Sequence, residues 1–233
     1  MVFFQTRSRE LELMDYPNPD PKVIRLAIRE IEIINRLLGG FNQNLGDIQS
    51  FKPEISHLEI QDWGCGSGDL LRKISLWGEK NNYLFDLIGI DLDKETIAYA
   101  KEKTNDKRIQ YWCLDVMSNQ LNPESTDIVG SCLFTHHFTD EAWVELLKKM
   151  FLVCRKGIII NDLHRHWLPY YAIGLLTRIF AKSKMVQFDA PLSVAKGFTR
   201  KELKVLLNRA GIANYTIRWK WAFRWSVVIF KSI

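Results

Sequence analysis

The segment from residue 58 to residue 71, LEIQDWGCGSGDLL, constrains the fold of this chain more than any other. Its first positions suit a strand, glycines occupy every second position from Gly64 to Gly68, and leucines at helical spacing follow. Glycine reaches backbone conformations closed to residues with a Cβ and lets a ligand approach closely. A strand, a glycine turn and a helix in succession commonly cradle a nucleotide-like ligand in an open α/β sheet.

The carboxylate of Asp62, two positions before the first glycine, decides which ligand this turn suits. Dinucleotide-binding proteins use G-x-G-x-x-G and hold a pyrophosphate at the helix N-terminus, and a carboxylate here would repel a pyrophosphate. The pattern D-x-G-x-G-x-G instead suits a ligand that carries an ammonium or a sulfonium. S-adenosylmethionine (SAM) is such a ligand and has no phosphate. At these residues the chain resembles the class I SAM-dependent methyltransferases.

Two further acids follow expected strands. Asp91 lies roughly 20 residues beyond the glycines, where doubly wound folds place an acid on ribose hydroxyls; the alternative, a helix cap, is weaker because Asp93 is better placed. Asp115, followed by Val116, stands where the methyltransferase pattern places an acid on the adenine amino group, although an ordinary loop acid is the alternative. The resemblance implies cofactor contacts by Asp62, Gly64, Cys65, Gly66, Gly68, Asp91, Leu92, Asp115, Val116 and Leu133.

Strand and helix signals alternate through the middle of the chain. We predict strands at 58–62, 83–90, 109–114, 127–134 and 156–162, helices at 68–78, 94–104 and 140–153, and two closing strands at 213–219 and 223–231. This alternation favours an α/β fold with a doubly wound, mostly parallel sheet covered on both faces. With the closing antiparallel strands the sheet has seven strands, as in the Rossmann-like methyltransferase fold.

We expect a single domain with four parts. These are an N-terminal helical cap (1–56), a SAM-binding core (57–163), an insert (164–198) and a C-terminal helix with antiparallel strands (199–233). In the cap, residues 1–19 are expected to be irregular, and 41–56 to form a loop or a short helix. The helix that begins near Pro21 is interpreted as a packing helix; alternatively, this helix and residues 12–16 form part of a substrate lid.

The insert breaks the alternation. We predict an apolar helix from Trp167 to Phe180 and then a polar connection over 182–197 that contains Pro191. Whether the insert is a lid over the acceptor, a core helix or a dimer face stays open.

Four of the five histidines directly follow the fourth and fifth expected strands. Ligands lie at the carboxyl ends of the strands in such sheets, and histidine can accept a proton near neutral pH. We predict His136, with His164, as the catalytic base. Because strand alternation aims only one of two neighbours at the ligand, His137 is expected to pack inward beside the pocket. The candidate acceptor-pocket residues are His137, His166, Trp167, Tyr170 and Tyr171.

A metal site is the competing interpretation of these histidines. The spacing Asp162-x-His164-x-His166 offers possible ligands, but no cysteine or glutamate in the sequence around it completes a set. We therefore expect no metal.

Three finer similarities bear on the acceptor. The segment 131–138 resembles the motif after strand four in small-molecule methyltransferases of the ubiquinone/menaquinone-biosynthesis type, and 12–15, 161–166 and 198–203 resemble bacterial methyltransferases of polyketide and pigment biosynthesis. The resemblance implies methylation, at oxygen, of a small hydrophobic hydroxylated acceptor of phenolic or polyketide-like type. The signature of methylases that act on nucleic-acid base amines is absent. A non-catalytic SAM-binding partner protein and an NAD-dependent oxidoreductase remain the alternatives.

Composition limits the partners. Of the 233 residues, 47% are hydrophobic and 25% charged, as in soluble globular proteins, and the formal net charge of +5 is too modest to indicate nucleic acid. The longest apolar stretch, 168–180, is interrupted by Arg178 and is too short for stable membrane insertion. The start of the chain does not resemble a signal peptide, and unpaired cysteines suggest a cytoplasmic protein. A homodimer is possible.

Overall fold

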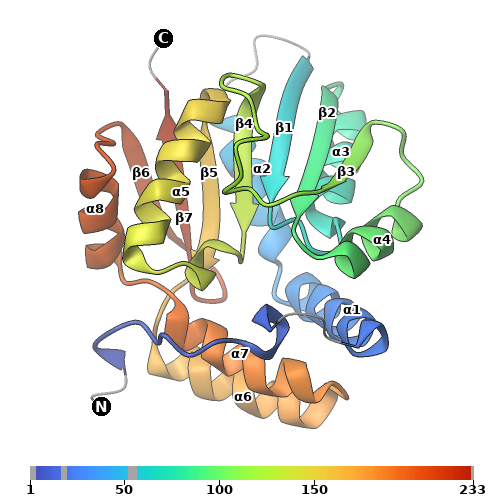
Figure 1. Ribbon diagram of the computed structural model, residues 1–233, viewed down its shortest axis with the longest axis vertical. Helices are drawn as coiled ribbons and strands as arrows, with labels where there is room; N and C mark the ends of the chain where they lie inside the picture. The colour runs from blue at the N-terminus through green and yellow to red at the C-terminus, as the bar shows by residue number, and fades with distance from the viewer. Residues whose placement is uncertain (1–3, 17–19, 52–56, 232–233) are drawn as a thin grey trace.

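The computed structural model describes residues 4–16, 20–51 and 57–231, and its centre is a seven-stranded sheet with the order β3-β2-β1-β4-β5-β7-β6 (Figure 1). β7 alone runs antiparallel to its neighbours. The predicted fold class is therefore confirmed. The strands are β1 His57–Trp63, β2 Leu84–Asp91, β3 Ile109–Cys113, β4 Thr126–Cys132, β5 Cys154–Leu163, β6 Tyr215–Lys220 and β7 Arg224–Phe230.

Helices cover both faces of the sheet and its carboxyl edge (Figure 1). Helix α5 and helix α3 lie on opposite faces, and α1, α6 and α7 lie below the strand ends. The helices are α1 Pro21–Leu37, α2 Gly40–Gln49, α3 Asp69–Asn81, α4 Lys94–Lys103, α5 Asp140–Val153, α6 Trp167–Phe180, α7 Lys184–Lys196 and α8 Arg200–Arg209, with short 3₁₀-helices η2 Leu13–Asp15 and η3 Thr135–His137.

The isoleucine run in β5 shows how the sheet separates two cores. Ile158 and Ile160 pack into the cluster with α5 and α8, whereas Ile159 packs into the cluster with α3 and α4. This is the burial on both faces that the apolar run predicts, because successive side chains of a strand point to opposite faces. A third cluster, around Ile24, Ile28 and Met185, joins α1 to α7 below the sheet.

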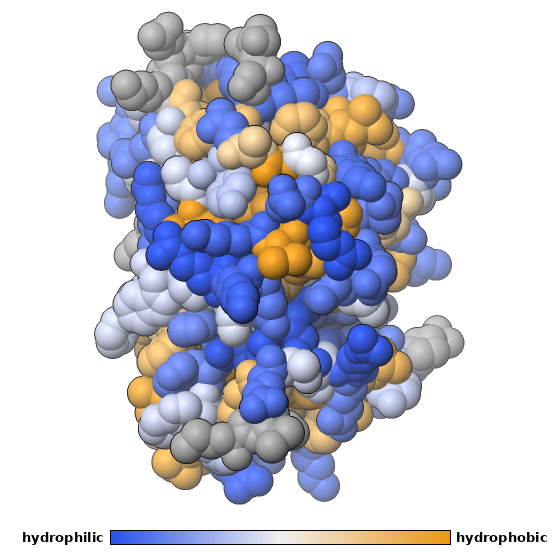
Figure 2. Space-filling model, turned by 90° about the vertical axis from the view of Figure 1, so that its left-hand side faces the viewer, coloured by the Kyte–Doolittle hydropathy of each residue, from blue (hydrophilic) through white to orange (hydrophobic). Residues whose placement is uncertain are grey.

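The surface on the α8 and β6 side is mostly hydrophilic, with separate apolar patches among the polar residues (Figure 2). Within the described residues, no helix is long and apolar enough to cross a membrane.

The polar connection predicted over 182–197 is wrong, because these residues form helix α7 with Pro191 inside it. Ser183 caps the helix by accepting a hydrogen bond from the backbone N–H of Val186. The reason for the helix is tertiary packing: Val186 and Ala195 are almost fully buried. Burial of this kind outweighs the unfavourable local preference of a proline.

Residues 40–49 form helix α2, the second of the two alternatives for this stretch. Residues 52–56 of that stretch, including Pro53, lie outside the described residues. The first three residues and residues 17–19 of the segment expected to be irregular also lie outside them.

Arg7 fixes the N-terminal segment against the carboxyl edge of the sheet. Its guanidinium donates hydrogen bonds to the carbonyl oxygens of His136 (2.9 Å), Phe138 (2.9 Å) and Lys196 (2.8 Å), and to the carboxylate of Asp140 (2.8 Å). The side chain is only 10% exposed. A single residue therefore links the segment 4–16 to η3, α5 and α7.

We predict that Arg7→Ala lowers the free energy of unfolding by about 2–4 kcal/mol, because buried carbonyl oxygens lose a charged donor. Urea denaturation measures this change. Arg9→Ala is the matched control, since Arg9 is exposed and should change stability little. Equal stability of the two variants would show that the N-terminal segment contributes nothing to the folded state.

Candidate active site

The glycine turn after β1 has the geometry of a ligand cradle. Gly64, Gly66 and Gly68 have φ angles of +71°, +53° and +73°, which disfavour residues with a Cβ. A Cβ on Gly64 would collide with Phe134, and one on Gly68 with Tyr111, whereas a Cβ on Gly66 would meet no atom within 4 Å. Gly64 and Gly68 thus serve close packing, and Gly66 is the glycine that opens toward a ligand.

The turn borders a cavity of about 1150 Å³. This volume exceeds that of an ordinary single-ligand site and can hold a cofactor together with a small acceptor. The lining residues divide by chemistry into two groups. We call the glycine turn and the acids around it the cofactor half: Asp62, Gly64, Cys65, Gly66, Ser67, Asp69, Asp91, Leu92, Leu133 and Phe134. We call a mainly apolar group from the N-terminal segment, α1 and η3 the acceptor half: Leu11, Met14, Tyr16, Ile24, Ile28, Ile31, His137 and Phe138.

Buried acids make the cofactor half a site for a cation. Asp62 is 2% exposed, and its Oδ1 has no hydrogen-bond partner. Burial, followed by the charges of Asp69 and Asp91, raises the pKa of Asp62 to about 8. Burial and the charge of Glu32 raise the pKa of Asp69 to about 6. A ligand with an ammonium or a sulfonium would relieve this unfavourable burial, as the sequence pattern predicts.

Asp91 contributes to the same half. Its carboxylate accepts hydrogen bonds from the backbone N–H groups of Gly66 (3.1 Å) and Asp93 (3.0 Å), and burial raises its pKa. Asp93, as expected, caps α4 through the backbone N–H of Thr96. Asp91 therefore both shapes the glycine turn and presents an acid to the cavity.

Three predicted cofactor residues lie outside the lining of this cavity. Asp115 is exposed, and its carboxylate accepts a hydrogen bond from the backbone N–H of Met117 within its own turn. Val116 is buried in the core next to α5, and Gly68 packs on Tyr111. Three residues that line the cavity were not predicted: Ser67, Asp69 and Phe134. The position of Asp69 directly after the last glycine could have indicated that it contacts the ligand.

We predict that the ligand-free protein becomes less stable as pH rises from about 4 to about 8. The folded state holds the proton of Asp62 more tightly than the unfolded state does, so stability is lost as pH rises toward the folded pKa. Asp62→Asn should flatten this dependence in thermal melts.

The same group predicts how ligand binding depends on pH. S-adenosylhomocysteine, which carries an ammonium, should raise the melting temperature more at about pH 8.5 than at about pH 6, because the ionised form of Asp62 attracts it. Asp115→Asn is the matched control and should behave like the unchanged protein. A melting shift that is equal at both pH values would contradict a role of Asp62 toward a cation.

The facing assignment for the paired histidines is wrong. His136 is 3% exposed and does not line the cavity, whereas His137 does. Both lie on η3, after the strand has ended, so the alternation of strand side chains does not apply to them. The Nδ1 of His136 lies 2.6 Å from Oδ1 of Asp162, whose other oxygen accepts the backbone N–H of His136.

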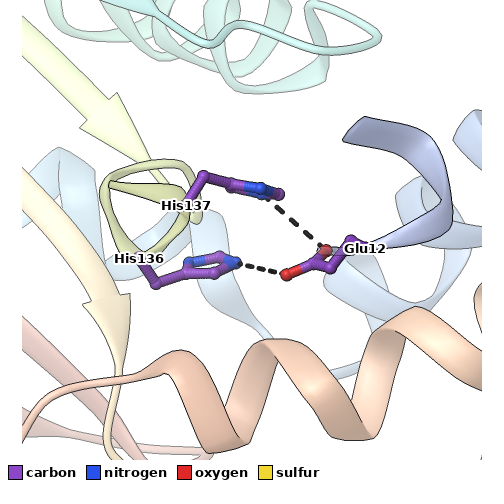
Figure 3. A group of neighbouring side chains, drawn as sticks. All are labelled: Glu12, His136 and His137. Carbon is purple, nitrogen blue, oxygen red and sulfur yellow. Dashed lines mark ion pairs between the residues drawn. The ribbon is translucent and has the colours of Figure 1, made fainter. Parts of the chain in front are cut away.

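The N-terminal segment brings a glutamate to these histidines. Glu12, 1% exposed, lies with Oε1 3.7 Å from Nε2 of His136 and with Oε2 3.8 Å from Nε2 of His137 (Figure 3). We call these three residues the Glu12–His136–His137 cluster. Asp15 Oδ1 lies 2.9 Å from Nδ1 of His137, and the Lys196 ammonium lies 3.4 Å from Glu12 and 3.2 Å from Asp15.

These contacts shift ionisation at the cluster. Burial acts to raise the pKa of Asp162, but the charge and hydrogen bond of His136 outweigh it and lower that pKa to about 2. Burial acts to lower the pKa of His137, but Asp15 and the charge of Glu12 raise it. Asp162 is therefore held in its charged form, in contrast to Asp62.

The aromatic residues of the insert lie elsewhere. His164 packs against Trp225 and Phe223, and His166 caps α6 through the backbone N–H of Leu168. None of His164, His166, Trp167, Tyr170 and Tyr171 lines the large cavity. The residues of the insert that were predicted as the acceptor wall do not line this cavity. Residues of α1 and of the segment 11–16 line it instead, and the one indication of this in the sequence was the alternative in which they form part of a lid.

Comparisons of the sequence with known proteins find methyltransferases that are similar to part of the chain. Residues 60–157 match a family described as a methyltransferase domain, which is less than half of the chain. A malonyl-[acyl-carrier protein] O-methyltransferase of Acetivibrio thermocellus is 28% identical over 80 residues, or 34% of this chain. The match spans only 26% of that relative.

Solved structures show the same fold. A SAM-dependent methyltransferase from Aquifex aeolicus is 18% identical with a TM-score of 0.64, over 91% of this chain and 99% of that one. A plantazolicin methyltransferase in complex with S-adenosylhomocysteine (SAH) is 19% identical with a TM-score of 0.66, over 91% and 96%. The chain thus has the fold of class I SAM-dependent methyltransferases, residues 60–157 are similar to a methyltransferase domain, and SAM is supported as the cofactor.

Proposed function

We propose that this protein transfers a methyl group from SAM to an oxygen of a small, hydrophobic, hydroxylated acceptor. The observation that carries the proposal is one cavity lined by two unlike groups of residues: buried acids around an open glycine turn, and apolar side chains that include isoleucines of α1. A cationic cofactor suits the first half, and an apolar acceptor suits the second.

The residues of the chain perform the tasks that such a transfer requires. When bound, the cofactor supplies a methyl carbon already activated by its sulfonium, so the protein must position the acceptor oxygen, exclude water and remove the proton. Asp62 and Asp91 hold the cofactor, and Ile24, Ile28 and Ile31 exclude water from the acceptor half. His137, the histidine on the cavity wall, places the Glu12–His136–His137 cluster next to the acceptor, and this cluster promotes loss of the hydroxyl proton.

The class of acceptor follows from the lining. Isoleucine, methionine and phenylalanine side chains contribute much of the lining of the acceptor half, and its polar groups include His137, Asp15, Tyr16 and Asn35. A phenolic or polyketide-like molecule fits this mixture, and the similarity of 12–15, 161–166 and 198–203 to methyltransferases of polyketide and pigment biosynthesis supports it. The name of one similar protein, a malonyl-[acyl-carrier protein] O-methyltransferase, supports transfer to an oxygen.

Calorimetry tests the cofactor first. We predict binding of SAM and S-adenosylhomocysteine and no binding of NAD, because a pyrophosphate would meet the buried acids of the cofactor half. Binding of NAD without SAM would favour an oxidoreductase. Binding of SAM without methylation of any member of a panel of phenols and hydroxylated polyketides would favour a non-catalytic SAM-binding protein.

We predict that His137→Ala lowers the catalytic constant by about 10²–10⁴-fold, because positioned proton-transfer groups contribute that much. The dissociation constant of SAM should change little, since His137 faces the acceptor half. His164→Ala, the same change outside the cavity lining, is the matched control and should keep its rate. If instead His164→Ala loses activity and His137→Ala keeps it, the proton-transfer role belongs to His164, the histidine that follows β5.

A further inference from the structure

We propose that Glu12, His136 and His137 bind one divalent transition-metal cation at the wall of the acceptor half. Both Nε2 atoms face the carboxylate of Glu12, and the three ligand atoms lie within 4.8 Å of one another (Figure 3). The separations of 3.7 and 3.8 Å are too long for hydrogen bonds. Two bonds of about 2.1 Å to one ion leave their ligand atoms roughly 3–4 Å apart, so the cluster has room for an ion.

Unpaired buried atoms point into this space. Nε2 of His136 and Oε1 of Glu12 have no hydrogen-bond partner, although both residues are almost fully buried. Leaving such groups without a partner is costly, and buried charged groups cost most. A cation between them would satisfy both atoms at once.

Both other ring nitrogens lie beside a carboxylate, as is usual for metal-bound histidines. Nδ1 of His136 is hydrogen-bonded to Asp162 at 2.6 Å, and Nδ1 of His137 lies 2.9 Å from Asp15 without the geometry of a hydrogen bond. A carboxylate at Nδ1 favours the tautomer with its proton there, which leaves the lone pair on Nε2. Both lone pairs would then face Glu12, as ligation requires.

The charges around the cluster also call for a cation. Glu12, Asp15 and Asp162 bring three carboxylates, and among the described residues Lys196 is the ammonium in contact with Glu12 and Asp15. One divalent ion would balance the remainder. The ammonium of Lys196 also weakens the proposed site, because it competes with the metal ion for Oε1 of Glu12. Protonation of both imidazoles would balance the same charges without a metal, and the experiment must separate these two states.

Two imidazoles and one carboxylate select the kind of ion. This ligand set suits Zn²⁺, Co²⁺ or Fe²⁺, whereas Mg²⁺ and Ca²⁺ prefer oxygen ligands throughout. Since His137 lines the cavity, the ion could also reach an acceptor oxygen there. Such an ion would lower the pKa of the acceptor hydroxyl and so promote loss of its proton. This catalytic part rests on the proposed function; the binding part does not.

Metal binding by the full chain tests the site without any assay of activity. After removal of metals with a chelator, equilibrium dialysis against Zn²⁺ should show one ion per chain. Glu12→Gln and His137→Gln should each weaken binding at least about 100-fold, and Asp162→Asn, which removes the partner of a ligand, about 10–100-fold. His164→Gln should bind as the unchanged chain does. Circular dichroism checks that each variant is folded.

Co²⁺ gives a second readout if Glu12→Gln fails to fold. Visible absorption of the Co²⁺-loaded chain should indicate nitrogen ligands and should be lost in His137→Gln but not in His164→Gln. No bound Zn²⁺ in the unchanged chain, or equal binding by the His137 and His164 variants, would overturn the proposal.

Activity then separates the two proposals. Methyl transfer that survives chelation would keep the methyltransferase and remove the catalytic role of the ion, whereas the absence of Zn²⁺ binding in dialysis would remove the site itself. Stoichiometric Zn²⁺ in a chain that does not bind SAM would keep the site and remove the function.

Discussion

The structure of the site depends on how residues 4–16 dock across the carboxyl edge of the sheet. Besides the bonds of Arg7, the backbone N–H groups of Leu13 and Met14 donate to the carboxylate of Asp189 at 2.7 and 3.2 Å. Asp189 belongs to α7, whose formation is therefore part of the same arrangement. Docking supplies Glu12 and Asp15 to the histidines and closes the acceptor half. Without it the strands would end at an open surface and His137 would have no carboxylate partner.

Buried carboxylates perform two different tasks at the carboxyl end of the sheet. Asp62 has no hydrogen bond to its Oδ1 and lies near other acids, so burial raises its pKa and leaves it ready for a cationic ligand. Asp162 is equally buried, but it has the imidazole of His136, the hydroxyl of Thr135 and two backbone N–H groups as partners. Its pKa is low, and it serves to orient. Whether a buried acid binds a ligand or positions a neighbouring side chain thus depends on its hydrogen-bond partners and not on how deeply it is buried.

Local patterns in the sequence were sufficient for the sheet and for the glycine turn that borders the cavity, since a glycine turn and an acid after a strand act within a few residues. They failed where distant segments meet. Helix α7 forms around Pro191 because α6, α1 and η2 pack against it, and the facing of His136 and His137 depends on a one-turn helix and on Asp162. A third prediction, the aromatic wall, failed because apolar composition alone does not say which cavity a helix faces. Trp167 and Tyr171 are in fact 52% and 64% exposed.

The position of the acceptor wall changes where specificity resides. Ile24, Ile28 and Ile31 lie on one face of α1, three and four residues apart, and that face closes the acceptor half opposite the glycine turn. Because Ile24 and Ile28 also pack against α7, the size of the acceptor half and the docking of the N-terminal segment are set by the same contacts. A change in these isoleucines would therefore alter the acceptor space and the placement of Glu12 together. Selection of the acceptor and positioning of the polar cluster are thus coupled through the packing of α1 on α7, which no single motif in the sequence describes.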